Sequence, residues 1–134
     1  MMETVKRIRI TESELDELGH VGYLQYILFL QDARREWYER AGFPLAKKRE
    51  EGVAVTMKKL EIVYLKEAAL GETLSVATSP ARLGTTSFTL KQVIRNRREE
   101  PVAEAAATMV CFNLAGRTSM IVPEELRRHF RAGT

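Results

Sequence analysis

The pattern of apolar and polar positions predicts a strand followed by one long helix. Apolar and polar residues alternate over residues 4–10, which is typical of a half-buried strand. Over residues 22–41 the apolar positions recur every three or four residues, which predicts a helix about 30 Å long. Gly42 suits the position after the last helical turn, and Pro44 cannot continue the helix. We therefore expect the helix to end near residue 41.

The first half of this helix is apolar on nearly every side. Tyr23, Leu24 and residues 26–30 leave almost no polar face, whereas residues 31–36 are amphipathic. A helix that is apolar all round is normally buried all round. We therefore expect the start of the helix to be enclosed by the rest of the fold.

The remainder of the chain predicts mostly strands. Segments rich in β-forming or alternating residues cover residues 53–65, 73–82, 87–97, 102–114 and 119–122, with a charged hairpin at residues 97–101. In the fourth of these segments a run of alternate alanines shares one face with Met109 and Cys111. Such small side chains suggest close approach of another element, such as the central helix. Pro123 then opens a short last helix.

This order of elements predicts an α+β fold, in which an antiparallel sheet of five or six strands is wrapped around one long central helix. The length of 134 residues and the apolar content of 45% fit a single domain over residues 1–134. The best apolar run, residues 21–30, is shorter than the roughly 20 residues that span a bilayer. No N-terminal segment has the features of a secretory signal. We therefore expect a cytoplasmic protein that has no membrane partner.

The charge of the chain is mildly basic, with 21 Lys and Arg against 18 Asp and Glu. The basic residues cluster, as at Arg97 and Arg98, and such clusters are either solvated or bind an anionic partner. Candidate anionic partners are a nucleotide phosphate and an acidic carrier protein. Acidic residues are interspersed throughout and no nucleic-acid motif occurs, so we expect no nucleic-acid partner.

Several chemistries find no support in the sequence. Two histidines far apart and the single cysteine, Cys111, give no metal-ligand spacing. Cys111 lies among apolar neighbours, which favours a small core residue over a reactive thiol. There is no Gly-x-Ser-x-Gly nucleophile motif and no glycine-rich phosphate loop. We expect no metal and no cofactor.

The segment directly before the long helix carries the candidate chemistry. Asp16 and His20 lie in a turn that leads into the helix start at Gly22 and Tyr23. A helix start offers backbone N–H groups without intrahelical partners and the positive end of the helix dipole. A carboxylate beside such donors suits attack on a carbonyl whose oxygen becomes negative. The alternative is that Asp16 caps the helix or closes the turn, and that His20 is a structural histidine bonded to the loop.

The same segment carries a resemblance to a known family. Asp16, Gly19 and Val21, with His20 before the valine and Tyr26 at the start of the helix, match the Asp-x-x-Gly-x-Val signature of the hotdog-fold thioesterases of the 4-hydroxybenzoyl-CoA thioesterase type. The resemblance continues through residues 32–37, 71–72, 83–87 and 121–123, and so covers nearly the whole chain. It implies a hotdog fold and hydrolysis of an acyl-CoA or acyl-carrier-protein thioester to free acid and thiol.

The resemblance also implies roles for residues near the signature. The residue matching Asp16 is the nucleophile or general base, and the backbone N–H at Gly22 or Tyr23 polarises the thioester carbonyl. His20 would orient the substrate or Asp16. Relatives often have two asparagines where this chain has Gly22 and Tyr23, so any role of those side chains is lost, whereas a backbone role survives.

Further residues are expected to contact the substrate. Tyr26 would line an acyl pocket, with core packing as its alternative. Thr86 and Ser87 would hold a reacting water or the substrate, with strand hydrogen bonding as the alternative. The carrier is expected to dock on four arginines, Arg82, Arg95, Arg97 and Arg98. Related proteins form their sites between subunits, which implies a homodimer, with a tetramer left open. A non-hydrolytic acyl-thioester-binding subunit on the same fold is the alternative function.

Overall fold

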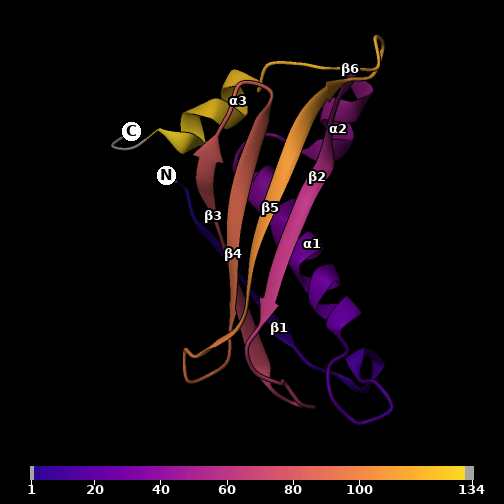
Figure 1. The fold of residues 1–134 in the computed structure, drawn as a ribbon, viewed down its shortest axis with the longest axis vertical. Helices are drawn as coiled ribbons and strands as arrows, with labels where there is room; N and C mark the ends of the chain where they lie inside the picture. The colour runs from indigo at the N-terminus through magenta and orange to yellow at the C-terminus, as the bar shows by residue number, and fades with distance from the viewer. Residues whose placement is uncertain (1, 132–134) are drawn as a thin grey trace.

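The computed structural model describes residues 2–131 as one antiparallel sheet packed against one long helix. The strands are β1 (Thr4–Arg9), β2 (Val53–Tyr64), β3 (Thr73–Leu83), β4 (Ser87–Arg95), β5 (Pro101–Asn113) and β6 (Thr118–Ser119). The helices are α1 (Tyr23–Arg40), α2 (Leu45–Glu50) and α3 (Glu124–Arg127), with 3₁₀ turns η1 (Glu12–Glu14) and η2 (Arg128–Phe130). Figure 1 shows α1 lying along one face of the curved sheet, so the predicted α+β layout is confirmed. Residues 1 and 132–134 of the predicted domain lie outside the described residues.

The strand order β1-β3-β4-β5-β2 leaves β1 and β2 at the two edges of the sheet, with short β6 pairing β5. Neighbouring strands in this order are antiparallel, and β2 follows β5 along almost its whole length, with one bulge between Met57 and Lys59. Within residues 2–131 no further strand pairs with the outer edge of β2. A long edge strand of this kind offers unpaired backbone groups to another chain.

The core lies between α1 and the sheet, in two apolar clusters along the helix. The first surrounds Tyr26 and Leu30, and the second surrounds Trp37 and Tyr38. The alternate alanines of β5 face this core, and Ala107 has no exposed surface. Their small side chains face the core, but the strands that α1 approaches most closely are β1 and β3 rather than β5.

The predicted enclosure of the helix start is wrong for the single chain. Tyr23, Leu24 and Leu28 are 66%, 61% and 49% exposed. The sheet covers only one side of α1, so apolar residues that point away from the sheet stay exposed within residues 2–131. No helix within residues 2–131 is long and apolar enough to cross a membrane.

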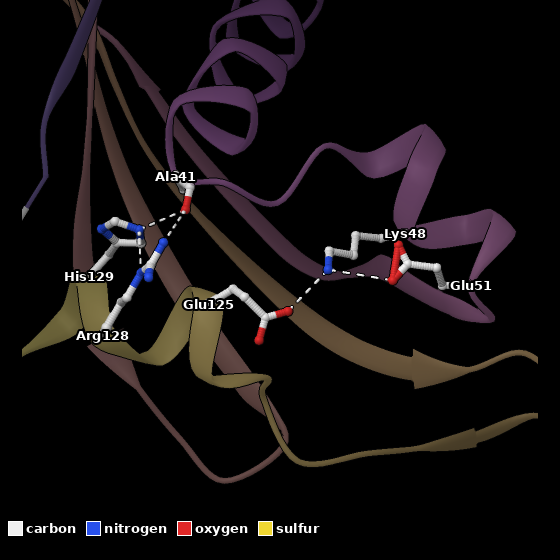
Figure 2. Close-up of polar contacts among 6 residues, drawn as sticks. All are labelled: Ala41, Lys48, Glu51, Glu125, Arg128 and His129. Carbon is white, nitrogen blue, oxygen red and sulfur yellow. Dashed lines mark hydrogen bonds and ion pairs between the residues drawn. The ribbon is translucent and has the colours of Figure 1, made fainter.

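The C-terminal segment closes the far end of α1. Ala41 follows the helix, and its carbonyl oxygen lies 2.8 Å from His129 Nε2 and accepts a hydrogen bond of 3.5 Å from Arg128 Nη2. Lys48 on α2, a helix the sequence pattern does not predict, donates to Glu125 on α3 at 3.1 Å (Figure 2). These contacts tie both short helices to the end of the fold opposite the start of α1 (Figure 1). The strand predicted over residues 119–122 is wrong except at Ser119, because β6 covers only Thr118–Ser119.

Candidate functional site

Asp16 is held by the backbone of its own turn. Its carboxylate oxygen Oδ1 accepts hydrogen bonds from the N–H groups of Leu18 (2.9 Å) and His20 (3.1 Å). The N–H of Asp16 donates to the carbonyl oxygen of His20 at 2.7 Å. Gly19 makes this tight turn possible, because its φ of +78° is strained for other residues. Within residues 2–131 the second carboxylate oxygen, Oδ2, accepts no hydrogen bond, and Asp16 is exposed.

The start of α1 lies beside this carboxylate. A Cβ atom placed on Gly22 would lie 3.9 Å from the Cβ of Asp16. Within the described residues no side chain caps the helix, so Asp16 closes its turn but does not cap α1. The backbone N–H groups that begin the helix at Gly22 and Tyr23 therefore stay available to a ligand. The structure brings together the carboxylate and the helix start, as the sequence predicts.

His20 contacts the connection between β2 and β3. Its ring nitrogen Nε2 lies 3.4 Å from the carboxylate of Glu67, and its backbone forms an isolated bridge with Ala69. The N–H of the next residue, Val21, donates to the carbonyl oxygen of Ala68 at 3.3 Å. His20 touches Asp16 through its backbone, and its side chain points to Glu67. Both roles considered for His20, orienting Asp16 and bonding to the surrounding loop, are compatible with these contacts.

Tyr23 and Tyr26 occupy different environments on the first turn of α1. The Tyr23 side chain is exposed, and its carbonyl oxygen accepts a hydrogen bond of 3.1 Å from the Tyr64 hydroxyl. Tyr26 is 4% exposed, and its hydroxyl is fully buried. Burial raises the pKa of Tyr26 above its usual value. In the single chain Tyr26 therefore belongs to the core, the alternative to an acyl pocket left open above.

Thr86 and Ser87 lie far from Asp16 in the single chain. The β3–β4 hairpin that carries them is at the end of the sheet opposite the start of α1 (Figure 1). Their carbonyl oxygens accept hydrogen bonds from the N–H groups of Cys111 (2.9 Å) and Gly84 (2.7 Å), which is the strand-bonding role left open above. Ser87 also lines a cavity of about 280 Å³ beside the sheet.

The four arginines do not form one cluster. Arg97 and Arg98 lie in the β4–β5 hairpin, at the same end of the sheet as the start of α1 (Figure 1), and line a groove of about 550 Å³. Arg95 and Arg97 line a second groove of about 490 Å³, which Arg7 of β1 also lines. Arg82 lies near the end of β3, at the opposite end of the sheet, and lines the same cavity as Ser87.

The structure also bears on two other kinds of chemistry, a thiol nucleophile and a metal site. Cys111 is fully buried, and burial raises the pKa of its thiol to about 11, so the thiolate nucleophile is disfavoured at neutral pH. No group of three His, Cys, Asp or Glu side chains within the described residues is placed to hold a metal ion.

The sequence did not predict that residues in the connection between β2 and β3 support the loop that carries Asp16. Glu67 and Ala68 contact His20 and Val21, and the Glu72 carboxylate accepts a hydrogen bond of 2.6 Å from the N–H of Ala69. In the sequence only the family resemblance at residues 71–72 falls in this connection, and it implies no contact for those residues. Their contacts join segments about 50 residues apart, which no local pattern encodes.

Thioester hydrolases are among the known proteins with a similar sequence or structure. The long-chain acyl-CoA thioesterase FadM of Escherichia coli is 28% identical over 122 residues, which cover 90% of this chain and 92% of FadM. The Escherichia coli acyl-CoA thioester hydrolase YbgC is 24% identical over 124 residues, 92% of each chain.

Solved structures share the fold at low identity. A 1,4-dihydroxy-2-naphthoyl-CoA thioesterase from Synechocystis superposes with a TM-score of 0.89 at 18% identity, covering 96% of both chains. A Staphylococcus aureus protein solved in complex with CoA gives a TM-score of 0.89 at 16% identity, covering 96% of this chain and 81% of that one. The sequence pattern of the thioesterase-like superfamily matches residues 10–130, and the chain therefore belongs to this hotdog-fold superfamily.

Proposed function

We propose that this protein hydrolyses acyl-CoA thioesters and that Asp16 is its catalytic carboxylate. The observation that carries the proposal is the free Oδ2 oxygen of Asp16 beside the uncapped start of α1, in a chain of this superfamily. The names of FadM and YbgC, both acyl-CoA thioester hydrolases, support the substrate class.

The geometry suits two steps of thioester hydrolysis. The thioester carbonyl oxygen would accept a hydrogen bond from the N–H of Gly22 or Tyr23, which stabilises the negative charge that develops on it. One donor of this kind is worth about 2.7–4 kcal/mol in comparable sites. Asp16 Oδ2 would then attack the carbonyl carbon, or take a proton from a water molecule that attacks it. If Asp16 attacks, the C–S bond breaks, the CoA thiolate leaves and takes a proton from solvent, and a water molecule then hydrolyses the Asp16–acyl anhydride to the free acid and the regenerated carboxylate. If Asp16 acts as a base, the water oxygen bonds to the carbonyl carbon, the C–S bond breaks, and the proton taken by Asp16 passes to the leaving thiolate.

The second subunit of a homodimer would complete this site. Among the described residues the outer edge of β2 is unpaired. Exposed Tyr23 and Leu24 on α1 adjoin exposed Tyr64 at the end of β2, since the Tyr64 hydroxyl bonds to the Tyr23 carbonyl. With a two-fold axis beside β2, a second subunit would cover these apolar side chains. The same axis would place opposite ends of the two sheets side by side. Such an arrangement would bring Thr86 and Ser87 of the partner subunit toward Asp16.

Sedimentation at micromolar concentration tests this association. We expect a dimer or a tetramer built from it, and replacing Leu24 with Asp should shift the protein toward monomers and reduce activity. A wild-type monomer that retains full activity would contradict the proposal.

The CoA or carrier-protein part of the substrate would dock on the basic residues at the β4–β5 hairpin. Both carriers are anionic, and Arg97 and Arg98 lie at the same end of the sheet as Asp16. Exposed charges are screened by salt, with a Debye length of about 10 Å at 0.1 M. We therefore expect KM to rise with salt, and the Arg97→Ala/Arg98→Ala variant to mimic this rise. A carrier-free thioester of the same acyl group should respond to neither change, and the docking proposal is wrong if KM for CoA substrates does not change either.

The catalytic assignment is tested by the Asp16→Asn variant in a thiol-release assay over acyl-CoA substrates of several chain lengths. The asparagine oxygen can still accept from Leu18 and His20, so the turn should survive. We expect kcat to fall by at least about a hundredfold, the lower range for loss of a general base. Glu17→Gln, which removes the neighbouring exposed carboxylate, is the matched control and should keep wild-type kcat.

Unchanged kcat in Asp16→Asn would refute the assignment. The alternative function, a non-hydrolytic subunit that binds acyl thioesters, predicts a different result. In that case the wild-type protein would bind acyl-CoA in calorimetry and release no thiol from any substrate.

A further inference from the structure

The turn that holds Asp16 depends on contacts outside itself. Its last residues, His20 and Val21, bond to the connection between β2 and β3 through Ala69 and Ala68. The 3.3 Å bond from Val21 N–H to Ala68 O fixes the backbone immediately before Gly22, the N-cap residue of α1. The position of the connection therefore sets where the carboxylate and the helix start lie relative to each other.

The connection is itself held from two sides. Ala68 is 1% exposed and packs into the core cluster that includes Val21 and Tyr26. On the other side, the Glu72 carboxylate oxygen Oε2 accepts the 2.6 Å hydrogen bond from Ala69 N–H. The backbone carbonyl of Glu72 also accepts from the N–H of Ile10 at 2.9 Å, which anchors Glu72 to the chain just after β1. Glu72 thus joins the connection to the sheet.

The Glu72 carboxylate has no competing ion pair among the described residues. It lies beside the groove that Arg97 and Arg98 line, yet no salt bridge joins it to either arginine. A carboxylate that bonds a backbone N–H makes a charge-assisted hydrogen bond, which is stronger than a neutral one. The Glu72 carboxylate therefore bonds to the N–H of Ala69, and the preceding residue, Ala68, supplies the carbonyl oxygen that accepts from Val21.

We infer that Glu72 is a positioning residue, whose carboxylate holds the β2–β3 connection so that Asp16 and the start of α1 keep their catalytic spacing. This inference rests on the proposed function of Asp16. Displacing a reacting group by about 1 Å can cost roughly a hundredfold in rate, so loss of this contact should lower kcat more than it changes KM.

Three variants at Glu72 distinguish an effect on the spacing between Asp16 and the start of α1 from an effect of the Glu72 charge. Glu72→Ala removes the acceptor and the charge, and we expect kcat to fall roughly ten- to hundredfold. Glu72→Gln removes the charge but keeps an oxygen that can accept from Ala69, so it should keep most of the wild-type kcat. Glu72→Asp keeps the charge on a side chain one methylene shorter, and it should behave like Glu72→Ala. If the Glu72 charge affects docking at Arg97 and Arg98, KM should change in both Glu72→Ala and Glu72→Gln.

Glu125→Ala is the matched structural control. It removes a carboxylate that accepts a 3.1 Å hydrogen bond from Lys48 at the opposite end of the fold (Figure 2). It should lower the melting temperature and leave kcat at 25 °C unchanged. If Glu72→Ala does not fold, Glu72→Asp supplies the same comparison with the charge retained.

Hydrogen exchange reports the loop position without any catalytic assay. The amides of Leu18, His20 and Val21 should exchange faster in Glu72→Ala and Glu72→Asp than in the wild type or in Glu72→Gln. Equal exchange in all four proteins would overturn the inference, as would wild-type kcat in folded Glu72→Ala or an equal loss in Glu72→Gln. If the wild-type protein hydrolyses no thioester, the proposed function fails, and the exchange experiment still decides whether Glu72 positions the loop.

Discussion

Replacing Gln92 with Leu should destabilise the fold by removing the polar centre of its core. Gln92 on β4 has no exposed surface, and its Oε1 accepts a 2.9 Å hydrogen bond from Arg34 Nη1 on α1. Its Nε2 donates to Leu30 O and Thr78 Oγ1, both at 3.0 Å. Arg34 is 7% exposed, burial lowers its pKa, and within residues 2–131 no carboxylate pairs with it. The substitution therefore leaves a largely buried charge without its hydrogen-bond acceptor.

The expected cost follows from these three contacts. A hydrogen bond to a charged group contributes about 1.5–3 kcal/mol, and each neutral one contributes about 1 kcal/mol. Leucine recovers part of this through apolar contacts, so we expect a loss of about 3 kcal/mol in the free energy of unfolding. For a chain of this length that loss lowers the melting temperature by about 10 °C. Urea unfolding followed by circular dichroism measures it, at one fixed protein concentration because association would add to stability.

A double-mutant cycle tests the reasoning. With Arg34 replaced by Met, no buried charge remains, so Gln92→Leu should then cost much less than it does in the wild type. We expect a coupling of at least about 1 kcal/mol between the two sites, typical of contacting residues. A cost of Gln92→Leu below about 1 kcal/mol, or two single costs that simply add, would refute this account of the core.

Three other predictions concern single residues. Because burial raises the pKa of Cys111 to about 11, iodoacetamide at pH 8 should label the native protein far more slowly than the urea-unfolded protein, as mass spectrometry would show. Gly42→Ala should lower the melting temperature, at a cost of about 1 kcal/mol, because φ is +82° and the new Cβ would lie 3.2 Å from Arg128 Nη2. The hydrogen bond from Lys48 lowers the pKa of Glu125, so its stabilisation is present above the unfolded pKa of about 4.3 and is lost as the pH falls through the lower folded pKa. The difference in melting temperature between wild type and Glu125→Gln should therefore shrink below about pH 4.

Local sequence patterns predicted the helix and strands whose apolar positions recur regularly over many residues. The three-or-four spacing and Gly42 placed the long helix at residues 22–41, and the structure has α1 at Tyr23–Arg40. Helix α2 was missed because its six residues make fewer than two turns, too few for a periodic signal. The exposure of Tyr23 and Leu24 was missed for another reason, because an apolar pattern says that a residue needs cover and does not say which chain supplies it.

The candidate site also has features that the sequence predicted and features that it did not. Asp16 and Gly22 were predicted to be neighbours because one short turn joins them, and the structure confirms it. Arg82 and Arg97 were expected to dock one carrier together, but the nine residues of β4, about 30 Å of strand, carry the chain from one end of the sheet to the other between them. The contacts of Glu72 could not be predicted, because they depend on how the loop before α1 meets the connection after β2.

The chain's single tryptophan lies where three distant segments meet. Trp37 has no exposed surface, its Nε1 donates to the carbonyl oxygen of Met2 at 2.9 Å, and its ring centroid lies 5.9 Å from that of His129 and 6.2 Å from that of Phe130. Its emission should therefore shift to longer wavelength when either the segment before β1 or the one after α3 detaches. Because this natural fluorophore is at the end of α1 away from Asp16, it can follow undocking of the chain's two ends in the same sample in which thiol release is measured.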